Sequence, residues 1–195
     1  MSFYHFARGV CNVVYSLLFR IRVIGKDNIP EHGGVLLCSN HISNLDPPLV
    51  GIRLKRKVHF MAKAELFQIP VLGLIISKVG AFPVKRGGVS KETIKGTLNL
   101  LRDGNVLGIF PEGSRKNPGV GKKGAAMFAL KSGAAVVPAA IIGDYKVFGR
   151  MTVIYGKPLD LTPFSEAGSA DLEQVTEYIM QEIQTLIREH RKEVA

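Results

Sequence analysis

The sequence predicts an α/β fold: a single domain with a largely parallel central sheet flanked by helices, preceded by an amphipathic N-terminal helix. From Ile21 onward, short β-rich apolar runs alternate with helical stretches, and this alternation is typical of a parallel sheet. The chain has 195 residues, 46% of them hydrophobic, which suffices for one domain with a substantial core but not comfortably for two. No repeat, low-complexity tract or linker divides it. We therefore expect a membrane-interface helix over residues 1–20 and one domain over residues 21–195.

Residues 3–19 are expected to form the N-terminal helix, with two distinct faces. The polar face holds His5, Arg8, Asn12, Ser16 and Arg20, and the apolar face holds Phe3, Phe6, Val10, Val13, Val14 and Leu17. Aromatic side chains on the apolar face, and no acidic residue before Asp27, favour a membrane interface over packing on the core. A signal peptide is disfavoured because Arg20 and Arg22 follow at once, without a small-x-small cleavage site. No apolar run reaches the roughly 20 residues that span a bilayer.

Seven strands and four more helices are expected after this helix. The strands fall near residues 21–24, 34–38, 58–62, 80–84, 106–110, 136–141 and 151–155. The helices fall near residues 47–54, 89–102, 124–132 and 169–191. The last helix carries its apolar residues on one face, so we expect it to pack on the domain.

The charge of the chain predicts an anionic partner. Lys and Arg total 26 against 16 Asp and Glu, a net charge of +10, although acidic residues outnumber basic ones from residue 160 onward. Nucleic acid, an anionic membrane and phosphorylated substrates all remain compatible with this charge. Nucleic acid ranks last because the chain has no recognisable reading motif and no surface of interleaved aromatics. Cys11 and Cys38, without a CxxC pair or a Cys/His cluster, argue for a reducing compartment and against a metal site.

The segment from Ser39 to Pro48 is the most informative part of the chain. It follows the apolar strand and precedes a helical pattern, so it forms a strand-to-helix loop. Asp46 before Pro47 predicts an N-cap with proline at the first helical position, and the loop could fold this carboxylate back towards His41. A histidine held by a carboxylate is a general-base arrangement. Since no G-x-S-x-G elbow is present, the base would act on the substrate's own hydroxyl; a capping Asp with an unrelated loop His is the alternative.

Three further segments place cations, glycines and a carboxylate where other strands end. They are Gly80–Gly87, Leu107–Lys116 and Gly121–Gly124, and the apolar run Val136–Ala140 follows them. In an open α/β sheet, ligands bind outside the carboxyl ends of the strands, where these loops would converge. Arginine offers a bidentate fork for phosphate, and glycine lets the backbone approach it.

Together these segments resemble the glycerolipid acyltransferase family, in particular the bacterial 1-acyl-glycerol-3-phosphate acyltransferases. The family's first block, N-H-x-x-x-x-D, is matched by Asn40, His41 and Asp46. Its second, third and fourth blocks are matched by Gly80–Gly87, Phe110–Arg115 and Val137–Ala139, and Ala62–Leu66 is similar to a recurrent family segment. The resemblance spans about residues 30–160. Ser114 stands where Thr is commoner in the family.

The resemblance implies a reaction and roles for single residues. His41 is then the base that deprotonates the free hydroxyl of lysophosphatidic acid, oriented by Asp46, and the alkoxide attacks a thioester donor directly. The residues implied to bind the phosphorylated acceptor are Arg86, Glu112, Gly113 and Arg115, with Lys63 as a phosphate or oxyanion partner. The donor is an acyl carrier protein or coenzyme A thioester, used as co-substrate without a further cofactor. Other acceptors, such as glycerol 3-phosphate or another lysophospholipid, and a non-enzymatic lipid-binding protein are the alternatives.

The resemblance and the single amphipathic helix together predict a peripheral, monotopic protein on the cytoplasmic face of the cell membrane. The basic body of the chain fits an anionic surface, and the cluster Arg53–Lys57 is a candidate contact. The apolar stretch 71–76 is a candidate wall for the acyl chain, although a core helix would explain it equally well. His32 and His59 are expected to be structural, since neither has Asp five residues further on.

Overall fold

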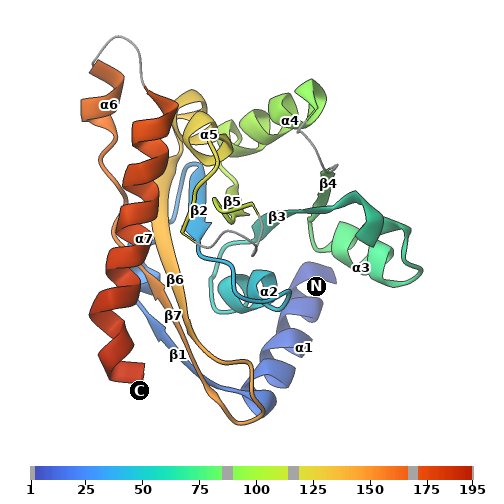
Figure 1. Cartoon of the computed structure of the whole chain (residues 1–195). Coiled ribbons are helices and arrows are strands. Elements are labelled where there is room, and N and C mark those ends of the chain that lie inside the picture. The colour runs from blue at the N-terminus through green and yellow to red at the C-terminus, as the bar shows by residue number, and fades with distance from the viewer. Residues whose placement is uncertain (1–2, 85–89, 114–118, 167–170, 195) are drawn as a thin grey trace.

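The computed structural model describes residues 3–84, 90–113, 119–166 and 171–194. Within these ranges seven strands form one sheet, in the order β1-β7-β6-β2-β5-β3-β4 (Figure 1). Their bounds are β1 Arg20–Ile24, β2 Val35–Ser39, β3 Val58–Lys63, β4 Phe82–Val84, β5 Val106–Ile109, β6 Ala135–Gly143 and β7 Arg150–Tyr155. All neighbours run parallel except β6 and β7, which are antiparallel. The predicted α/β fold with its largely parallel sheet is confirmed, and so is each expected strand.

The expected helices are also present, together with shorter ones that the sequence analysis missed. The described α-helices are α1 Phe3–Leu18, α2 Asp46–Gly51, α3 Leu72–Lys78, α4 Lys91–Arg102, α5 Gly124–Ser132, α6 Thr162–Glu166 and α7 Leu172–Val194. Two 3-10 helices, η1 and η2, cover Lys26–Asn28 and Ala64–Gln68. The missed elements are η1, η2 and α6, each of three to five residues and therefore too short to display a helical period in the sequence. Helix α3 falls on the apolar stretch 71–76, for which a core helix was one of the two interpretations.

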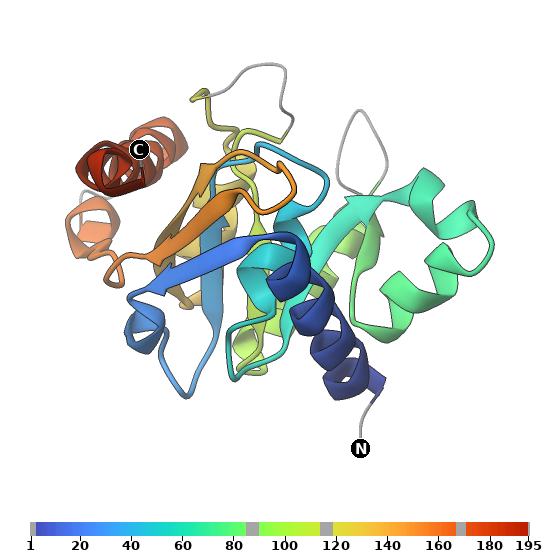
Figure 2. The ribbon, with the colours of Figure 1, turned by 90° about the horizontal axis from the view of Figure 1, so that it is seen from below.

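The sheet separates two hydrophobic cores, and β2 contributes to both. Val35 and Leu37 face the core that α1 and α2 cover. Leu36 and Cys38 face the core that α4, α5 and α7 cover. Figure 2 shows α1 and α7 on opposite sides of the sheet. Because both faces of β2 are buried, its sequence is a continuous apolar run rather than an alternating one.

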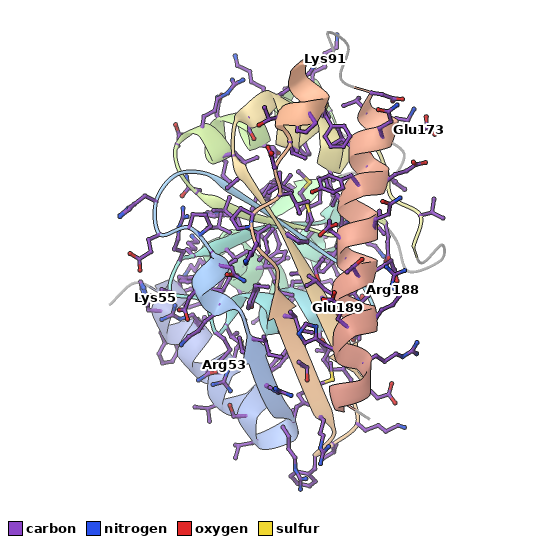
Figure 3. All side chains as sticks on the ribbon, turned by 90° about the vertical axis from the view of Figure 1, so that its left-hand side faces the viewer. Arg53, Lys55, Lys91, Glu173, Arg188 and Glu189 are labelled. Carbon is purple, nitrogen blue, oxygen red and sulfur yellow. The ribbon has the colours of Figure 1, made fainter. Side chains whose placement is uncertain are left out.

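Helix α7 packs along the sheet as its apolar face predicted. Val175, Ile179 and Ile183 are fully buried at a four-residue spacing. In Figure 3 the helix lies lengthwise over the sheet, with Glu173 and Arg188 on its outer side. Burying one apolar stripe fixes the helix on the domain, while its charged side stays in water.

Helix α1 packs on the domain through the buried residues Tyr4 and Tyr15, which belong to neither predicted face, and only part of the predicted polar face meets the domain. The guanidinium of Arg8 donates to the carbonyl of Leu54 at 2.7 Å, and Arg53 donates to the hydroxyl of Ser16 at 2.8 Å. On the opposite side, the side chains of Phe6 and Leu17 are 62% and 68% exposed. The apolar face of α1 therefore points away from the rest of the domain.

The apolar stretch around α3 is not a core helix. Val71 and Leu74 are 67% and 69% exposed, and Gly73 is the buried residue of this helix. The alternative that these residues fill the core is therefore wrong. None of the described helices combines the length and the apolarity that a bilayer-spanning segment requires.

Candidate active site

His41 and Asp46 lie on the loop that leaves the carboxyl end of β2. The imidazole Nδ1 of His41 is 2.7 Å from the carboxylate Oδ2 of Asp46. The Asp46 side chain is fully buried, whereas that of His41 is 18% exposed. The buried carboxylate accepts a hydrogen bond from Nδ1–H, so the neutral imidazole carries its free lone pair on Nε2. This pair was expected from the sequence, and the structure brings the two side chains together.

Asp46 is held by the loop that precedes it, and it is not the N-cap that the sequence predicted. Helix α2 begins at Asp46, and Leu45 occupies the N-cap position without a side-chain hydrogen bond. The next two residues are prolines, which have no N–H to donate to a capping carboxylate. Oδ2 instead accepts the backbone N–H groups of Ile42 and Ser43, both at 2.7 Å. The carboxylate is thereby turned back towards His41.

The other oxygen of this carboxylate has a partner from a distant part of the chain. Tyr145, two residues beyond the end of β6, donates its hydroxyl to Asp46 Oδ1 at 2.7 Å. Burial raises the pKa of Tyr145, and the hydrogen bond to the Asp46 carboxylate raises it further. The hydroxyl therefore remains protonated and acts as a donor at neutral pH.

The imidazole of His41 is also held from one side by aromatic rings. It stacks on Phe110, with ring centroids 4.2 Å apart and an interplanar angle of 19°. Phe60 of β3 stacks in turn on Phe110, with ring centroids 6.0 Å apart. Among the described residues, none makes a hydrogen bond to His41 Nε2.

Glu112 joins the loop after β5 to the loop after β2. Its side chain is 3% exposed, and its Oε2 accepts the backbone N–H of His41 at 3.3 Å. Its Oε1 accepts the backbone N–H of Gly119 at 2.9 Å. Gly113 closes the turn that follows Phe110. Its N–H donates to the carbonyl of Phe110 at 2.9 Å, and its φ is positive, at 64°. Among the described contacts, Glu112 thus fixes backbone beside the histidine.

Asn40 fastens the start of the His41 loop to β6. Its Nδ2 donates to the carbonyl of Ile141 at 3.0 Å, and its Oδ1 accepts the Ile141 N–H at 2.7 Å. The side chain is 6% exposed. It continues the pairing of β2 with β6 past the point where β2 ends. An amide can do this because it carries both a donor and an acceptor.

The remaining expected site residues fall into two groups. Lys63 is the last residue of β3 and is exposed, so it lies at the same edge of the sheet as His41. Arg86 and Arg115 lie outside the described residues, as does Ser114. Within the part of the chain that the structure describes, no three or more His, Cys, Asp and Glu side chains are grouped to hold a metal ion.

Two direct partners of the His41–Asp46 pair, Tyr145 and Phe110, were not predicted from the sequence. Tyr145 lies 99 residues from Asp46. A signal was present, since Tyr145 follows the apolar strand β6 as His41 follows β2. Because the carboxyl ends of parallel strands meet at one edge of the sheet, the position of Tyr145 just after β6 could have predicted that it lies near His41.

The chain is similar to known acyltransferases over most of its length. The family model described as Acyltransferase matches residues 20–142. A 1-acyl-sn-glycerol-3-phosphate acyltransferase of Bacillus subtilis is 35% identical over 191 residues, which cover 94% of this chain and 96% of that protein. One from Streptococcus pneumoniae is 30% identical over 199 residues, which cover 97% of this chain and 75% of that protein.

A solved structure has the same fold. The crystal structure of the 1-acyl-sn-glycerophosphate (LPA) acyltransferase from Thermotoga maritima superimposes with a TM-score of 0.73 and 23% sequence identity, over 95% of this chain and 79% of that chain. The resemblance noted in the four sequence blocks is thus confirmed by the family model and by relatives that cover nearly the whole chain. The chain belongs to the acyltransferase family that includes the 1-acyl-sn-glycerol-3-phosphate acyltransferases, and it is an O-acyltransferase.

Proposed function

We propose that the protein transfers a fatty acyl group from a thioester donor to the sn-2 hydroxyl of 1-acyl-glycerol 3-phosphate, giving phosphatidic acid in phospholipid synthesis. The relatives from Bacillus subtilis and Streptococcus pneumoniae are 1-acyl-sn-glycerol-3-phosphate acyltransferases, which supports this acceptor. The observation that carries the chemistry is the His41–Asp46 pair, with Nδ1 held at 2.7 Å by a buried carboxylate and the ring partly open to solvent.

In the proposed reaction, Nε2 of His41 takes the proton of the acceptor hydroxyl as its oxygen attacks the thioester carbonyl. Asp46 stabilises the imidazolium that forms. The tetrahedral intermediate then breaks its C–S bond, and the leaving thiolate receives the proton from the imidazolium. The acyl group never resides on the protein, so each cycle returns His41 to its neutral form and releases one free thiol.

The phosphate of the acceptor is proposed to bind at the same edge of the sheet. Arg86 and Arg115 supply the bidentate cations of this proposal, and Lys63 is placed at the end of β3 to contact phosphate or the oxyanion. Gly113 lets the backbone turn directly after Glu112, with a positive φ. Glu112 contributes by holding that backbone in place.

We further propose that the protein lies peripherally on the cytoplasmic face of the cell membrane through the exposed face of α1. A helix that packs through Tyr4 and Tyr15 and presents Phe6, Val10, Val13 and Leu17 outward is arranged for contact with an apolar medium. The cations Lys57 and Lys78 flank it, over the rings of Tyr4 and Phe3 at 5.5 and 5.4 Å. Such cations favour an anionic leaflet, by about 1 kcal/mol for each one near the surface.

Exposed apolar residues continue from α1 in both directions. Towards α3 lie Val71 and Leu74, and towards the β6–β7 connection lie Val147 and Phe148, all more than 60% exposed. The backbone N–H of Phe148 donates to the carbonyl of Leu18 at the end of α1. Figure 1 shows α3, α1 and the β6–β7 connection along one side of the molecule. This side is proposed to face the lipid from which the acceptor enters.

The test is thiol release from acyl-coenzyme A and from acyl carrier protein donors, with lysophosphatidic acid or glycerol 3-phosphate as acceptor. Wild type and His41→Ala are assayed in parallel on anionic vesicles. Release that requires lysophosphatidic acid and disappears in the variant is the expected result, and the better donor identifies the carrier. Release with glycerol 3-phosphate alone would reassign the acceptor, and full activity of His41→Ala would exclude the base.

A further inference from the structure

The six-residue connection between β6 and β7 carries a side chain that reaches the centre of the proposed active site. Tyr145 donates its hydroxyl to Asp46 Oδ1 at 2.7 Å. The nearest sequence block, Val137–Ala139, lies within the buried part of β6. Tyr145 itself is outside all four blocks on which the family resemblance rests.

The two oxygens of Asp46 have separate sets of donors. Oδ2 accepts His41 Nδ1 and the backbone N–H groups of Ile42 and Ser43, each at 2.7 Å. Among the described residues, Tyr145 alone donates to Oδ1. Asp46 has no exposed surface, so water cannot replace that donor without opening the site. A buried ionised oxygen left without a donor is unfavourable.

Tyr145 is in turn held by the end of α1 and by Phe19, the residue that follows it. Its ring meets Phe19 edge to face, with centroids 5.4 Å apart and an interplanar angle of 82°. The same connection is attached to the end of α1 because Phe148 donates its N–H to Leu18. The contact of the Tyr145 ring with Phe19 and the attachment of the connection to Leu18 therefore hold the Tyr145 hydroxyl towards Asp46.

We propose that Tyr145 is a positioning residue for the acyl transfer: its hydroxyl fixes the Asp46 carboxylate so that Oδ2 stays on His41 Nδ1. This inference rests on the proposed function, since it assigns to Tyr145 a role that acts through the general base. Without the hydroxyl, the carboxylate is held through Oδ2 alone, and its orientation against His41 Nδ1 is less tightly fixed. Turnover then falls even though the acceptor still binds.

Removing the hydroxyl also has a defined consequence for the pH profile. The groups facing the pair are Tyr145 from the β6–β7 connection, Tyr15 from α1, whose hydroxyl donates to the Leu45 carbonyl at 3.0 Å, and Glu112 from the loop after β5. A donor to Oδ1 stabilises the ionised carboxylate. Its loss leaves the charge of the Asp46 carboxylate less stabilised, and with Oδ2 still on Nδ1 this favours the protonated pair. The acid limb of the activity profile therefore moves to higher pH.

The experiment compares Tyr145→Phe with wild type and with the control Tyr155→Phe. Phenylalanine keeps the ring that packs on Phe19 and removes only the hydroxyl. Tyr155 is a buried tyrosine whose hydroxyl donates to the Val50 carbonyl at 2.6 Å, so its variant loses a comparable hydrogen bond away from Asp46. Rates are measured as thiol release over a range of pH, with acceptor titrations and thermal unfolding for each variant.

We expect Tyr145→Phe to lower kcat about 10-fold to 100-fold, with KM for the acceptor within about twofold of wild type and an acid limb at higher pH. Tyr155→Phe should lose similar thermal stability but keep its kcat and its pH profile. Equal kcat and pH profiles for the two variants would overturn the inference. His41→Ala serves as the separate reference: if it stays active, the proposed base is wrong, whereas an inactive His41→Ala with a fully active Tyr145→Phe refutes Tyr145 alone.

Discussion

The ring of His41 stacks on that of Phe110 with centroids 4.2 Å apart. Phe110 in turn stacks on Phe60, and the Phe60 ring lies directly over Gly108 of β5, where an added Cβ would meet it at 2.2 Å. A row of three rings thus runs from a glycine in the sheet to the imidazole. The space left by that glycine lets the rings support the face of the imidazole, while the carboxylate holds its edge at Nδ1.

Gly108→Ala is therefore expected to harm both stability and turnover. The new methyl group displaces Phe60, and the stacked rings transmit this displacement to His41; overpacking of this kind costs about 1–3 kcal/mol. Chemical denaturation and thiol-release assays measure the two effects. The control is Gly96→Ala on the exposed side of α4, where an added Cβ meets nothing within 4 Å. That change should stabilise the protein by about 0.5–1 kcal/mol, and a neutral Gly108→Ala would contradict the packing argument.

Asp46→Asn and His41→Ala are expected to separate chemistry from stability. The amide of Asn cannot accept every donor that Asp46 accepts, so the loop loses hydrogen bonds in a fully buried position, at a cost of about 1–3 kcal/mol. Asp46→Asn also removes the negative charge that stabilises the imidazolium of His41, so turnover should fall about 10²-fold to 10⁴-fold. His41→Ala should abolish turnover with a smaller loss of stability. A fully active Asp46→Asn protein would show that the carboxylate has only a structural role.

Leu17→Asp should weaken binding to anionic vesicles without destabilising the fold. Leu17 is 68% exposed on the outer face of α1, so the folded domain loses little contact. Removing a leucine from a lipid contact costs about 1.5–3 kcal/mol, which corresponds to at least a tenfold weaker partition in vesicle sedimentation. Gln181→Asp on α7 adds the same charge on the other side of the sheet. Equal vesicle binding by the two variants would argue against α1 as the contact.

His59 is expected to make the protein less stable in mild acid. Burial lowers its pKa below the ordinary 6.5, and the charge of Lys57 lowers it further, against the hydrogen bond to the Gly80 carbonyl. The unfolded chain therefore takes up a proton at higher pH than the folded one, so stability is lost as the pH falls through about 6.5 towards the lower folded pKa. His59→Gln should reduce this loss, as measured by urea unfolding between about pH 8 and pH 5. A wild type and variant with parallel pH dependence would exclude His59 as a contributor.

Much of the site followed from where residues stand relative to strands. His41, Glu112 and Lys63 each lie at or just after the carboxyl end of a strand, and parallel strands bring those ends to one edge. The histidine and aspartate were also predictable as a pair, because five residues of loop allow direct contact. The predicted capping role of Asp46 was wrong because Pro47 and Pro48 have no N–H groups to offer its carboxylate.

Local period, proline and strand ends were enough to predict the strands, the longer helices, the position of the His41 loop and the apolar face of α1. The side of α1 that packs inward was not predictable from them, because it is set by contacts with another segment, such as those of Arg8 with the Leu54 carbonyl and of Tyr4 with the Val58 N–H. Likewise, the hydroxyl of Tyr145 and the ring of Phe110 meet the pair through strand order and side-chain packing, which bring together residues far apart in the chain. A sequence pattern predicts the faces of a helix and the ends of a strand, whereas the contacts between such elements are set by the packing of the whole domain.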